Sequence, residues 1–297
     1  MKIEELAQLQ PVLFERFEHI LQQHRLNHAY LFTGAFGSFE MAQCLAQSLF
    51  CTNKNGVLPC GECRNCRLIE EEDFSDVTVV RPVNQIIKTE RVRELVRNFS
   101  QSGFESSKQV FIICDADKMH VNAANSLLKV IEEPQSEVYI FLLTADENLI
   151  LPTIKSRAQL FHFPKNQAYL LEKLEQTGLI KTQAELLTAY SQTEEEAMRL
   201  AASPAFFDLA AECDRFASLC LNRKETAYLQ VAKLASLAVD KEKQEQALKL
   251  LELLFAKEMQ TTWGRFYLEG IFTARKMWQA NVNFQNALEY MVLQERE

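Results

Sequence analysis

Four cysteines in the first quarter of the chain have the spacing of a metal-binding site. They form the pattern C-x8-C-x2-C-x2-C and are Cys51, Cys60, Cys63 and Cys66. Thiolates at this spacing, with Gly61 in the tight turn, bring four sulfurs onto one tetrahedral centre, for which zinc is the usual metal. Four protein ligands leave no open position, so we predict a structural Zn²⁺ site. An iron–sulfur cluster and a redox-active C-x-x-C pair are the alternatives.

A second segment, residues 28–41, has the outline of a phosphate-binding loop without the side chains that bind phosphate. A strand-like apolar run is followed by Gly34, Gly37 and a helix-like segment. A P-loop, G-x-x-x-x-G-K-[ST], needs a lysine for the β- and γ-phosphates and a hydroxyl for Mg²⁺. Counted from Gly34, these positions hold Glu40 and Met41. A carboxylate repels a triphosphate and methionine is no ligand for a hard cation, so we expect this degenerate loop to bind no ATP.

An apolar run over residues 110–114 ends at an acidic residue, Asp115. P-loop ATPases hold magnesium and polarise the attacking water at such a position. The glutamate expected next is replaced by Ala116. We therefore interpret Asp115 and Asp117 as residues that cap the following turn. The chain therefore lacks the glutamate that activates water as well as the P-loop lysine and hydroxyl that bind phosphate and Mg²⁺.

Residues 151–158 follow a strand-like segment and include Ser156 and Arg157. An arginine at such a junction is usually a solvated surface charge. It gains interest here because the chain otherwise looks like an ATPase without an ATP site. A guanidinium is planar and permanently charged, which suits it to the γ-phosphate of a neighbour. Arg157, beside Ser156, is therefore a candidate for an arginine finger that a subunit without ATPase activity supplies in trans, a role worth about 10³–10⁵ in rate.

The order of the expected elements predicts the fold. Strands are expected over 30–33, 77–80, 110–114, 138–143 and 159–163, with helices over 11–24, 38–50, 89–100 and 122–133. This alternation implies right-handed crossovers and a mostly parallel sheet. Short helices follow to residue 203, and then amphipathic helices over 205–222, 225–239, 243–261, 263–280 and 283–294. We predict an α/β domain over 1–163 with the zinc module at 51–66, a small helical domain over 164–204 and an all-α bundle over 205–297.

The composition excludes several classes of function. With 297 residues, 47% of them hydrophobic and 24% charged, the chain has an ordinary globular composition. Its net charge of −8 argues against a protein that by itself binds DNA independently of the DNA sequence. No long apolar run is present, and residues 1–10 are acidic and amphipathic, so we expect no membrane span and no signal peptide. We expect a cytoplasmic protein whose eight cysteines are thiols or metal ligands.

Together the motifs resemble the AAA+ clamp-loader subunits of bacterial DNA polymerase III. Residues 28–37 resemble the strand and loop that open these subunits, and the cysteine module resembles their zinc module. Residues 125–134 resemble the helix N-x-L-L-K-x-L-E-E-P, and residues 155–158 resemble a Ser-Arg-Cys motif with Ala158 in the last position. The resemblance covers about residues 1–165 with the motifs in order, and the helical remainder more loosely.

The resemblance implies an AAA+ P-loop-type α/β domain, a small helical lid and a collar bundle that holds a loader ring together. Motor subunits of the family keep the P-loop lysine and its stator subunits typically lack it, so this chain resembles a non-hydrolysing stator. Arg157 would then reach the ATP site of an adjacent motor subunit. Residues 193–197, Thr-Glu-Glu-Glu-Ala, lack the arginine with which a lid senses ATP, which agrees with an empty nucleotide site.

The implied partners are the motor (gamma/tau) and delta subunits and the sliding clamp, with primed DNA reached through the hetero-oligomer. We expect no intrinsic ATPase activity, although the chain would count as a subunit of the DNA-directed DNA polymerase III holoenzyme. Two other functions remain open. The chain is an AAA+ ATPase with a nonstandard nucleotide site if replacing Glu40 by lysine changes little. It is a zinc-dependent DNA-binding module if the lone protein binds DNA in a salt-sensitive way.

Overall fold

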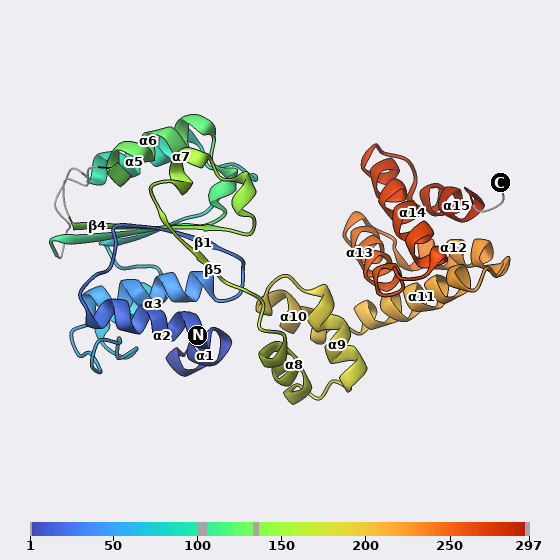
Figure 1. Ribbon diagram of the computed structural model, residues 1–297, viewed down its shortest axis with the longest axis horizontal. Helices are drawn as coiled ribbons and strands as arrows, with labels where there is room; N and C mark the ends of the chain where they lie inside the picture. Colours follow the sequence, from blue (N-terminus) through green and yellow to red (C-terminus); the bar gives the residue numbers. More distant parts are fainter. Residues whose placement is uncertain (1, 100–105, 133–136, 295–297) are drawn as a thin grey trace. The chain divides into compact units, whose positions relative to one another are not determined.

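The computed structural model describes residues 2–99, 106–132 and 137–294 (Figure 1). The chain divides into two compact units, Met1–Tyr169 and Leu170–Glu297. The predicted division into three domains at residues 163 and 204 stays a prediction. Within the described ranges, no helix combines the length and the apolar character needed to cross a bilayer.

The first unit is built on a parallel sheet with the strand order β2-β3-β4-β1-β5. Its strands are β1 (Ala29–Thr33), β2 (Val77–Val80), β3 (Lys108–Ile113), β4 (Glu137–Thr144) and β5 (Gln159–His162). In the register of the centre, Tyr30 of β1 lies opposite Phe141 of β4 and Gln159 of β5. Each strand begins and ends within two residues of the predicted range, and the parallel α/β sheet is confirmed.

Helices cover both faces of this sheet (Figure 1). One face carries α1 (Ile3–Leu9), α2 (Pro11–Gln22) and α3 (Ser38–Phe50), and α4 (Arg64–Glu70) packs against α3. The other face carries α5 (Thr89–Phe99), α6 (Val121–Glu132) and α7 (Pro152–Lys155). Short 3₁₀ turns, η1 (Ala116–Lys118) and η2 (Glu147–Leu149), follow β3 and β4.

Side chains of the three central strands, β1, β3 and β4, alternate between two hydrophobic cores. In β1, Tyr30 and Phe32 join the core beneath α2 and α3, whereas Ala29 and Leu31 join the core beneath α6. Phe17 of α2 packs edge-on against Phe32, with ring centroids 5.5 Å apart. A sheet covered on both faces needs apolar residues at every strand position, which explains the continuous apolar runs in the sequence.

The second unit is helical throughout its described part. It contains α8 (Gln167–Gln176), which starts in the first unit, α9 (Lys181–Tyr190), α10 (Glu194–Ala201), α11 (Pro204–Leu221), α12 (Thr226–Leu237), α13 (Lys241–Lys257), α14 (Thr262–Gln279) and α15 (Phe284–Leu293). Side chains cap several of these helices at their first turn, among them Ser203, Asp240 and Thr261. Phe255 of α13 stacks on Tyr267 of α14 at 5.4 Å between ring centroids. The predicted bundle helices are confirmed.

Candidate functional site

The parallel sheet separates the candidate site residues into two groups. Gly34 and Asp115 follow β1 and β3, so they lie at the carboxyl ends of the strands. Arg157 precedes β5, which pairs in parallel with β1, so it lies at the amino ends. A strand of five residues spans about 17 Å. Arg157 therefore lies too far from the loop of its own chain to act on a phosphate bound there.

The backbone conformation and the close packing at Gly34, the first glycine of the degenerate loop, both require a residue without a side chain. Gly34 has φ +95°, and a Cβ atom there would lie 2.2 Å from the carbonyl oxygen of Phe163. Its N–H donates to the carbonyl oxygen of Thr144, at the end of β4, at 2.9 Å. The glycine thus allows β1 and the exit of β5 to approach closely, whether or not a phosphate binds.

Helix α1 and the residue after it, Gln10, pack against this loop. A Cβ atom at Gly37 would lie 3.0 Å from Cδ2 of Leu9 and 3.4 Å from Cδ1 of Leu6. The buried Gln10 donates from Nε2 to the carbonyl oxygens of Phe36 at 2.8 Å and Pro164 at 2.6 Å. The sequence analysis missed these contacts. Leu6, Leu9 and Gln10 thus hold the loop in place through contacts within this chain.

The two residues at the lysine and hydroxyl positions lie in the first turn of α3 and stabilise this helix. Met41 is 1% exposed and belongs to the core beneath α3, so its sulfur does not face a cation site. Glu40 lies half-buried in the first turn of α3, where a carboxylate is favourable to the positive end of the helix dipole. The preceding residue, Phe39, lies under the guanidinium of Arg81 at 5.1 Å. The start of α3 thus carries a carboxylate where a P-loop has the positive charge of a lysine.

The acidic residues after β3 contact neighbours of their own chain. The carboxylate of Asp115 pairs with Nζ of Lys118 at 3.5 Å and makes no capping hydrogen bond, so its predicted capping role is wrong. Asp115 has φ +48°, and its carbonyl oxygen accepts from the N–H of Lys118. Asp117 accepts from the hydroxyl of Thr144 at 2.8 Å. These contacts brace the turn after β3 against the end of β4.

Arg157 lies two residues after the end of α7 and is held by three acceptors. Its Nε donates to Oε1 of Glu132 at 2.5 Å, and its Nη1 donates to the carbonyl oxygen of Thr153 at 2.9 Å. The hydroxyl of Ser156 accepts from Nη1 at 3.2 Å and donates to the carbonyl oxygen of Thr153. The side chain of Arg157 is 36% exposed. Ser156 therefore orients the guanidinium, which stays accessible at the amino end of the sheet.

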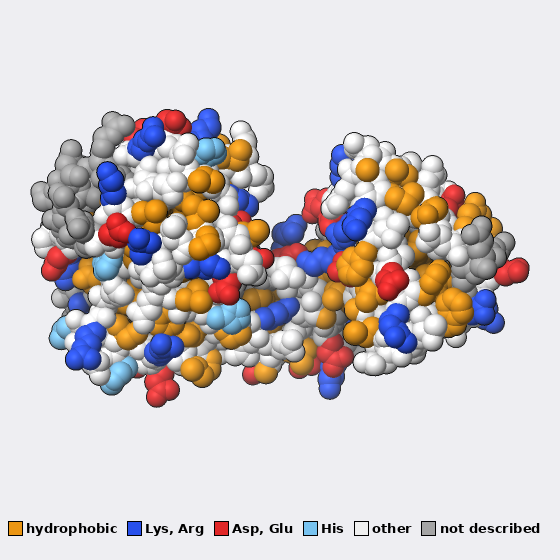
Figure 2. All heavy atoms as spheres, turned by 45° about the horizontal axis from the view of Figure 1, so that its top comes forward, with side chains coloured by type: hydrophobic (Ala, Val, Ile, Leu, Met, Phe, Trp, Pro, Cys, Tyr) orange, Lys and Arg blue, Asp and Glu red, His pale blue; other side chains and the backbone are white. Residues whose placement is uncertain are grey.

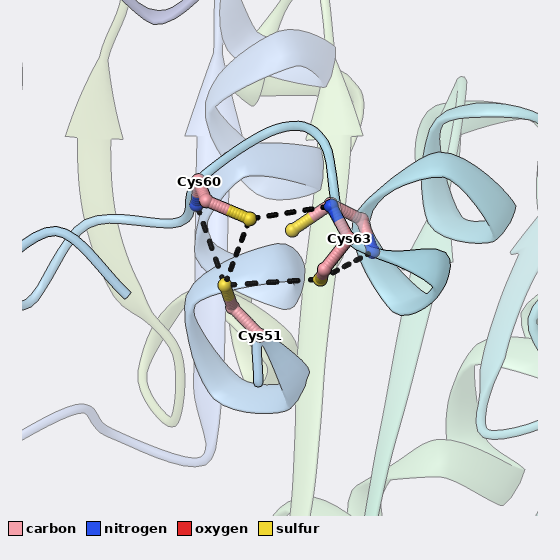
Figure 3. A group of neighbouring side chains, drawn as sticks. Cys51, Cys60 and Cys63 are labelled. Carbon is pink, nitrogen blue, oxygen red and sulfur yellow. Dashed lines mark hydrogen bonds between the residues drawn. The ribbon is translucent and has the colours of Figure 1, made fainter. Parts of the chain in front are cut away.

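The four predicted metal ligands come together in one cluster. Figure 3 shows three of them, Cys51, Cys60 and Cys63, with their sulfurs turned toward one another. All four sulfurs, including that of Cys66, lie within 4.8 Å of one another. Sγ of Cys51 is 3.5 Å from that of Cys60 and 3.9 Å from that of Cys63. In a tetrahedron with metal–sulfur bonds of 2.3 Å these distances are about 3.8 Å, so the geometry fits zinc.

Helix ends position the four sulfurs. Cys51 follows the last residue of α3, Cys63 caps the first turn of α4, and Cys66 lies in that turn with no exposed surface. The N–H of Cys63 donates to Sγ of Cys60 at 3.3 Å, and this hydrogen bond lowers the pKa of Cys60. Burial raises the pKa of Cys63, but the N–H of Cys66 and other donors outweigh it and lower that pKa to about 5. Hydrogen bonds thus favour the thiolate form of Cys60 and Cys63, whereas burial raises the pKa of Cys51 and of Cys66, so the fit to a metal rests on the geometry of the four sulfurs.

Amide side chains, among them Gln47 and Asn65, hold the module to α3. Gln47 of α3 donates from Nε2 to the carbonyl oxygen of Cys66 at 2.9 Å. Asn65 of α4 donates from Nδ2 to the carbonyl oxygen of Phe50 at 2.9 Å. Because these contacts fix the backbone on both sides of the cysteines, the site is part of the first unit rather than an appendage.

Comparison with known proteins places the chain among DNA polymerase III subunits. The family model described as "DNA polymerase III, delta subunit" matches residues 9–167. The chain is 30% identical to the DNA polymerase III subunit delta' of Bacillus subtilis, over 99% of this chain and 98% of that protein. It is 35% identical to the subunit delta' of Pseudomonas aeruginosa over 44% of this chain and 41% of that protein.

Two further matches concern the tau and gamma subunits. The chain is 33% identical to the subunit tau/gamma of Haemophilus influenzae, over 57% of this chain and 23% of that protein. The crystal structure of a gamma subunit-related protein from Thermotoga maritima matches with a TM-score of 0.51. That match is 17% identical and covers 95% of this chain and 98% of the other. At this identity the likeness concerns the fold alone.

Proposed function

Because this chain belongs to the family of DNA polymerase III delta-prime subunits, we propose that it is the non-hydrolysing stator of a bacterial clamp loader. In this role it assembles with motor (gamma/tau) and delta subunits in the cytoplasm. The assembly loads the sliding clamp on primed DNA. Relatives named delta' and tau/gamma support membership in such an assembly.

The observation that carries the proposal is the position of Arg157 relative to the loop of its own chain. The loop lies at the carboxyl ends of the strands and has Glu40 and Met41 where a P-loop has lysine and a hydroxyl, whereas Arg157 lies at the amino ends. Subunits that associate head to tail in a ring bring opposite ends of neighbours together. An arginine at the amino end then meets the phosphates held at the carboxyl end of the next subunit.

The chemistry follows from the guanidinium. Charge builds up on the γ-phosphoryl oxygens as the phosphoryl group is transferred, and an arginine finger stabilises that charge. Arg157 supplies the positive charge, and Ser156 keeps its Nη1 in place. The neighbour supplies lysine, Mg²⁺ and the attacking water. The subunit thus completes a catalytic site without binding ATP itself.

The helical part of the chain provides the remaining functions of a stator. We assign residues 164–204 to the lid and 205–297 to the collar that oligomerises with partner subunits. Large hydrophobic side chains are exposed on α12 and α15, which pack against each other; they include Leu229 (71% exposed), Tyr290 (43%) and Leu293 (45%). Hydrophobic side chains are also visible between charged ones on the face of this unit in Figure 2. Such side chains suit contacts between helices of different subunits.

Zinc in the Cys51–Cys66 cluster has a structural role in this proposal. The four thiolates would hold one Zn²⁺ and leave no position for water or substrate. A closed site contributes folding free energy rather than chemistry. The module then stabilises the end of α3 and the position of α4.

Nucleotide binding by the isolated chain tests the stator role against the alternative. Titration with Mg-ATP followed by calorimetry is expected to show no binding up to millimolar concentration. A loader reconstituted with this chain should turn over ATP faster than the motor subunits alone. Micromolar binding of Mg-ATP would instead favour an AAA+ ATPase with a nonstandard site, and salt-sensitive binding of DNA by the lone chain would favour a DNA-binding module.

A further inference from the structure

We propose that Glu132 is a positioning residue for the arginine finger. Its carboxylate holds the guanidinium of Arg157 in the orientation in which the phosphate of a neighbouring subunit meets it. The inference rests on the proposed function of Arg157 and adds to it a second residue, which the sequence motifs alone did not connect with the finger.

The geometry of the pair supports this role. Glu132 is the last residue of α6, and Arg157 follows α7; the two helices pack against each other. Oε1 of Glu132 accepts from Nε of Arg157 at 2.5 Å, on a different nitrogen from the Nη1 that donates to Thr153 and Ser156. Acceptors on two nitrogens fix both the position and the plane of a guanidinium, because its donors form a rigid fork.

The backbone beneath Glu132 is anchored in the core. Leu127 and Ile131 of α6 are almost completely buried. The carbonyl oxygen of Ile131 lies 2.6 Å from Nε2 of His28, the residue immediately before β1. The last turn of α6 is thus tied to the start of the central strand. A carboxylate on such a turn is a fixed point against which a long side chain can be ordered.

A fixed conformation of the Arg157 side chain before assembly should raise the rate of ATP turnover. A long arginine side chain that is disordered must lose rotamer freedom when it reaches the phosphate, and this loss raises the barrier of the step. An exposed ion pair contributes little to folding stability, and here the side chains are 36% and 46% exposed. Removal of Glu132 should therefore leave the fold intact and appear in the rate of the assembled loader.

The experiment measures ATP turnover by a reconstituted loader that contains the wild-type chain, Glu132→Ala, Glu132→Gln, Arg157→Ala or the double variant Glu132→Ala/Arg157→Ala. Glu137→Ala is the matched control, since this carboxylate lies at the same end of the sheet but pairs with Lys108. Thermal unfolding and incorporation into the loader are measured for every variant. These two measurements separate a folding defect from a kinetic one.

We expect Glu132→Ala to lower kcat about two- to tenfold, the ordering cost of one long side chain, with KM for ATP within about twofold. Glu132→Gln should keep most of the rate because its amide oxygen still accepts from Nε. In the Arg157→Ala background, Glu132→Ala should cause no further loss. An unchanged or faster rate for Glu132→Ala, or a further loss in that background, overturns the inference alone. If Arg157→Ala itself has no effect, the proposed function fails and the positioning role fails with it.

Discussion

Removal of the metal is predicted to open one segment of the first unit and leave its sheet folded. The segment comprises residues 51–70, which contain the four cysteines and α4. Two perturbations test this: chelation of the purified protein, and Cys66→Ser, which removes the most buried ligand. Cys114→Ser is the matched control, because this half-buried thiol at the end of β3 is no part of the cluster.

The size of the effect follows from the contacts of the module. Gln43, Gln47 and Asn65 donate side-chain hydrogen bonds between α3 and the module, each worth about 1 kcal/mol. Burial of Ile69 adds about 2 kcal/mol. Ordering the backbone costs about 1 kcal/mol or more per residue over 51–66, which exceeds these contributions. A structural zinc contributes about 10 kcal/mol or more, which offsets most of that cost, so the segment should open when the metal is removed.

Metal analysis and hydrogen exchange provide the assay. Gently purified protein should contain about one equivalent of zinc, and the Cys114→Ser control should match it. After chelation, amides of residues 51–70 should exchange about 100-fold faster or more, while those of β1 and β4 keep their protection. Less than about half an equivalent of zinc, or unchanged exchange in the segment after chelation, would refute the reasoning. Iron and an absorption band in the visible range would favour the iron–sulfur alternative.

Two further predictions concern the stability of the first unit. Gly34→Ala should destabilise it by about 3 kcal/mol or more in denaturant unfolding, because the new Cβ would lie 2.2 Å from the carbonyl oxygen of Phe163 at a φ of +95°. Gly56→Ala, also at positive φ but with open space around it, should cost only about 1 kcal/mol; equal losses would show that the close approach is not the cause. The hydrogen bond from Arg81 holds the pKa of Glu72 below its usual value, so this pair stabilises the fold above about pH 4.3 and the contribution is lost as pH falls through the lowered pKa. Arg81→Met should remove that part of the acid dependence between about pH 5 and 3, and an unchanged pH profile would contradict it.

Much of the fold was predictable because its elements have strong local signals. Strand β3 is covered on both faces, so Val110–Ile113 form an uninterrupted apolar run. The long helices α11 and α13 follow Ser203 and Asp240, whose side chains cap their first turns. The clustering of the four cysteines was predictable because their spacing is a property of the chain and not of its packing.

The contacts that define the candidate site were not predictable in the same way. Helix α4 has only seven residues, too few for a periodic pattern, so no helix was predicted for this part of the chain. Leu9 and Gln10 meet the loop around Gly37 only through the tertiary fold. The pair Glu132–Arg157 joins residues 25 apart on different helices, and no pattern in the sequence relates them.

ATP turnover by the assembled loader, with Arg157→Ala compared with the wild-type chain, tests the central claim most directly. Arg91→Ala is a suitable control, because this arginine is exposed on α5 of the same unit and pairs with Glu94. At the ATP site that the subunit shares with its neighbour, the account predicts a loss of about 10³-fold or more for Arg157→Ala and no loss for the control. A rate within about twofold of wild type for Arg157→Ala would contradict the claim that this subunit completes its neighbour's catalytic site.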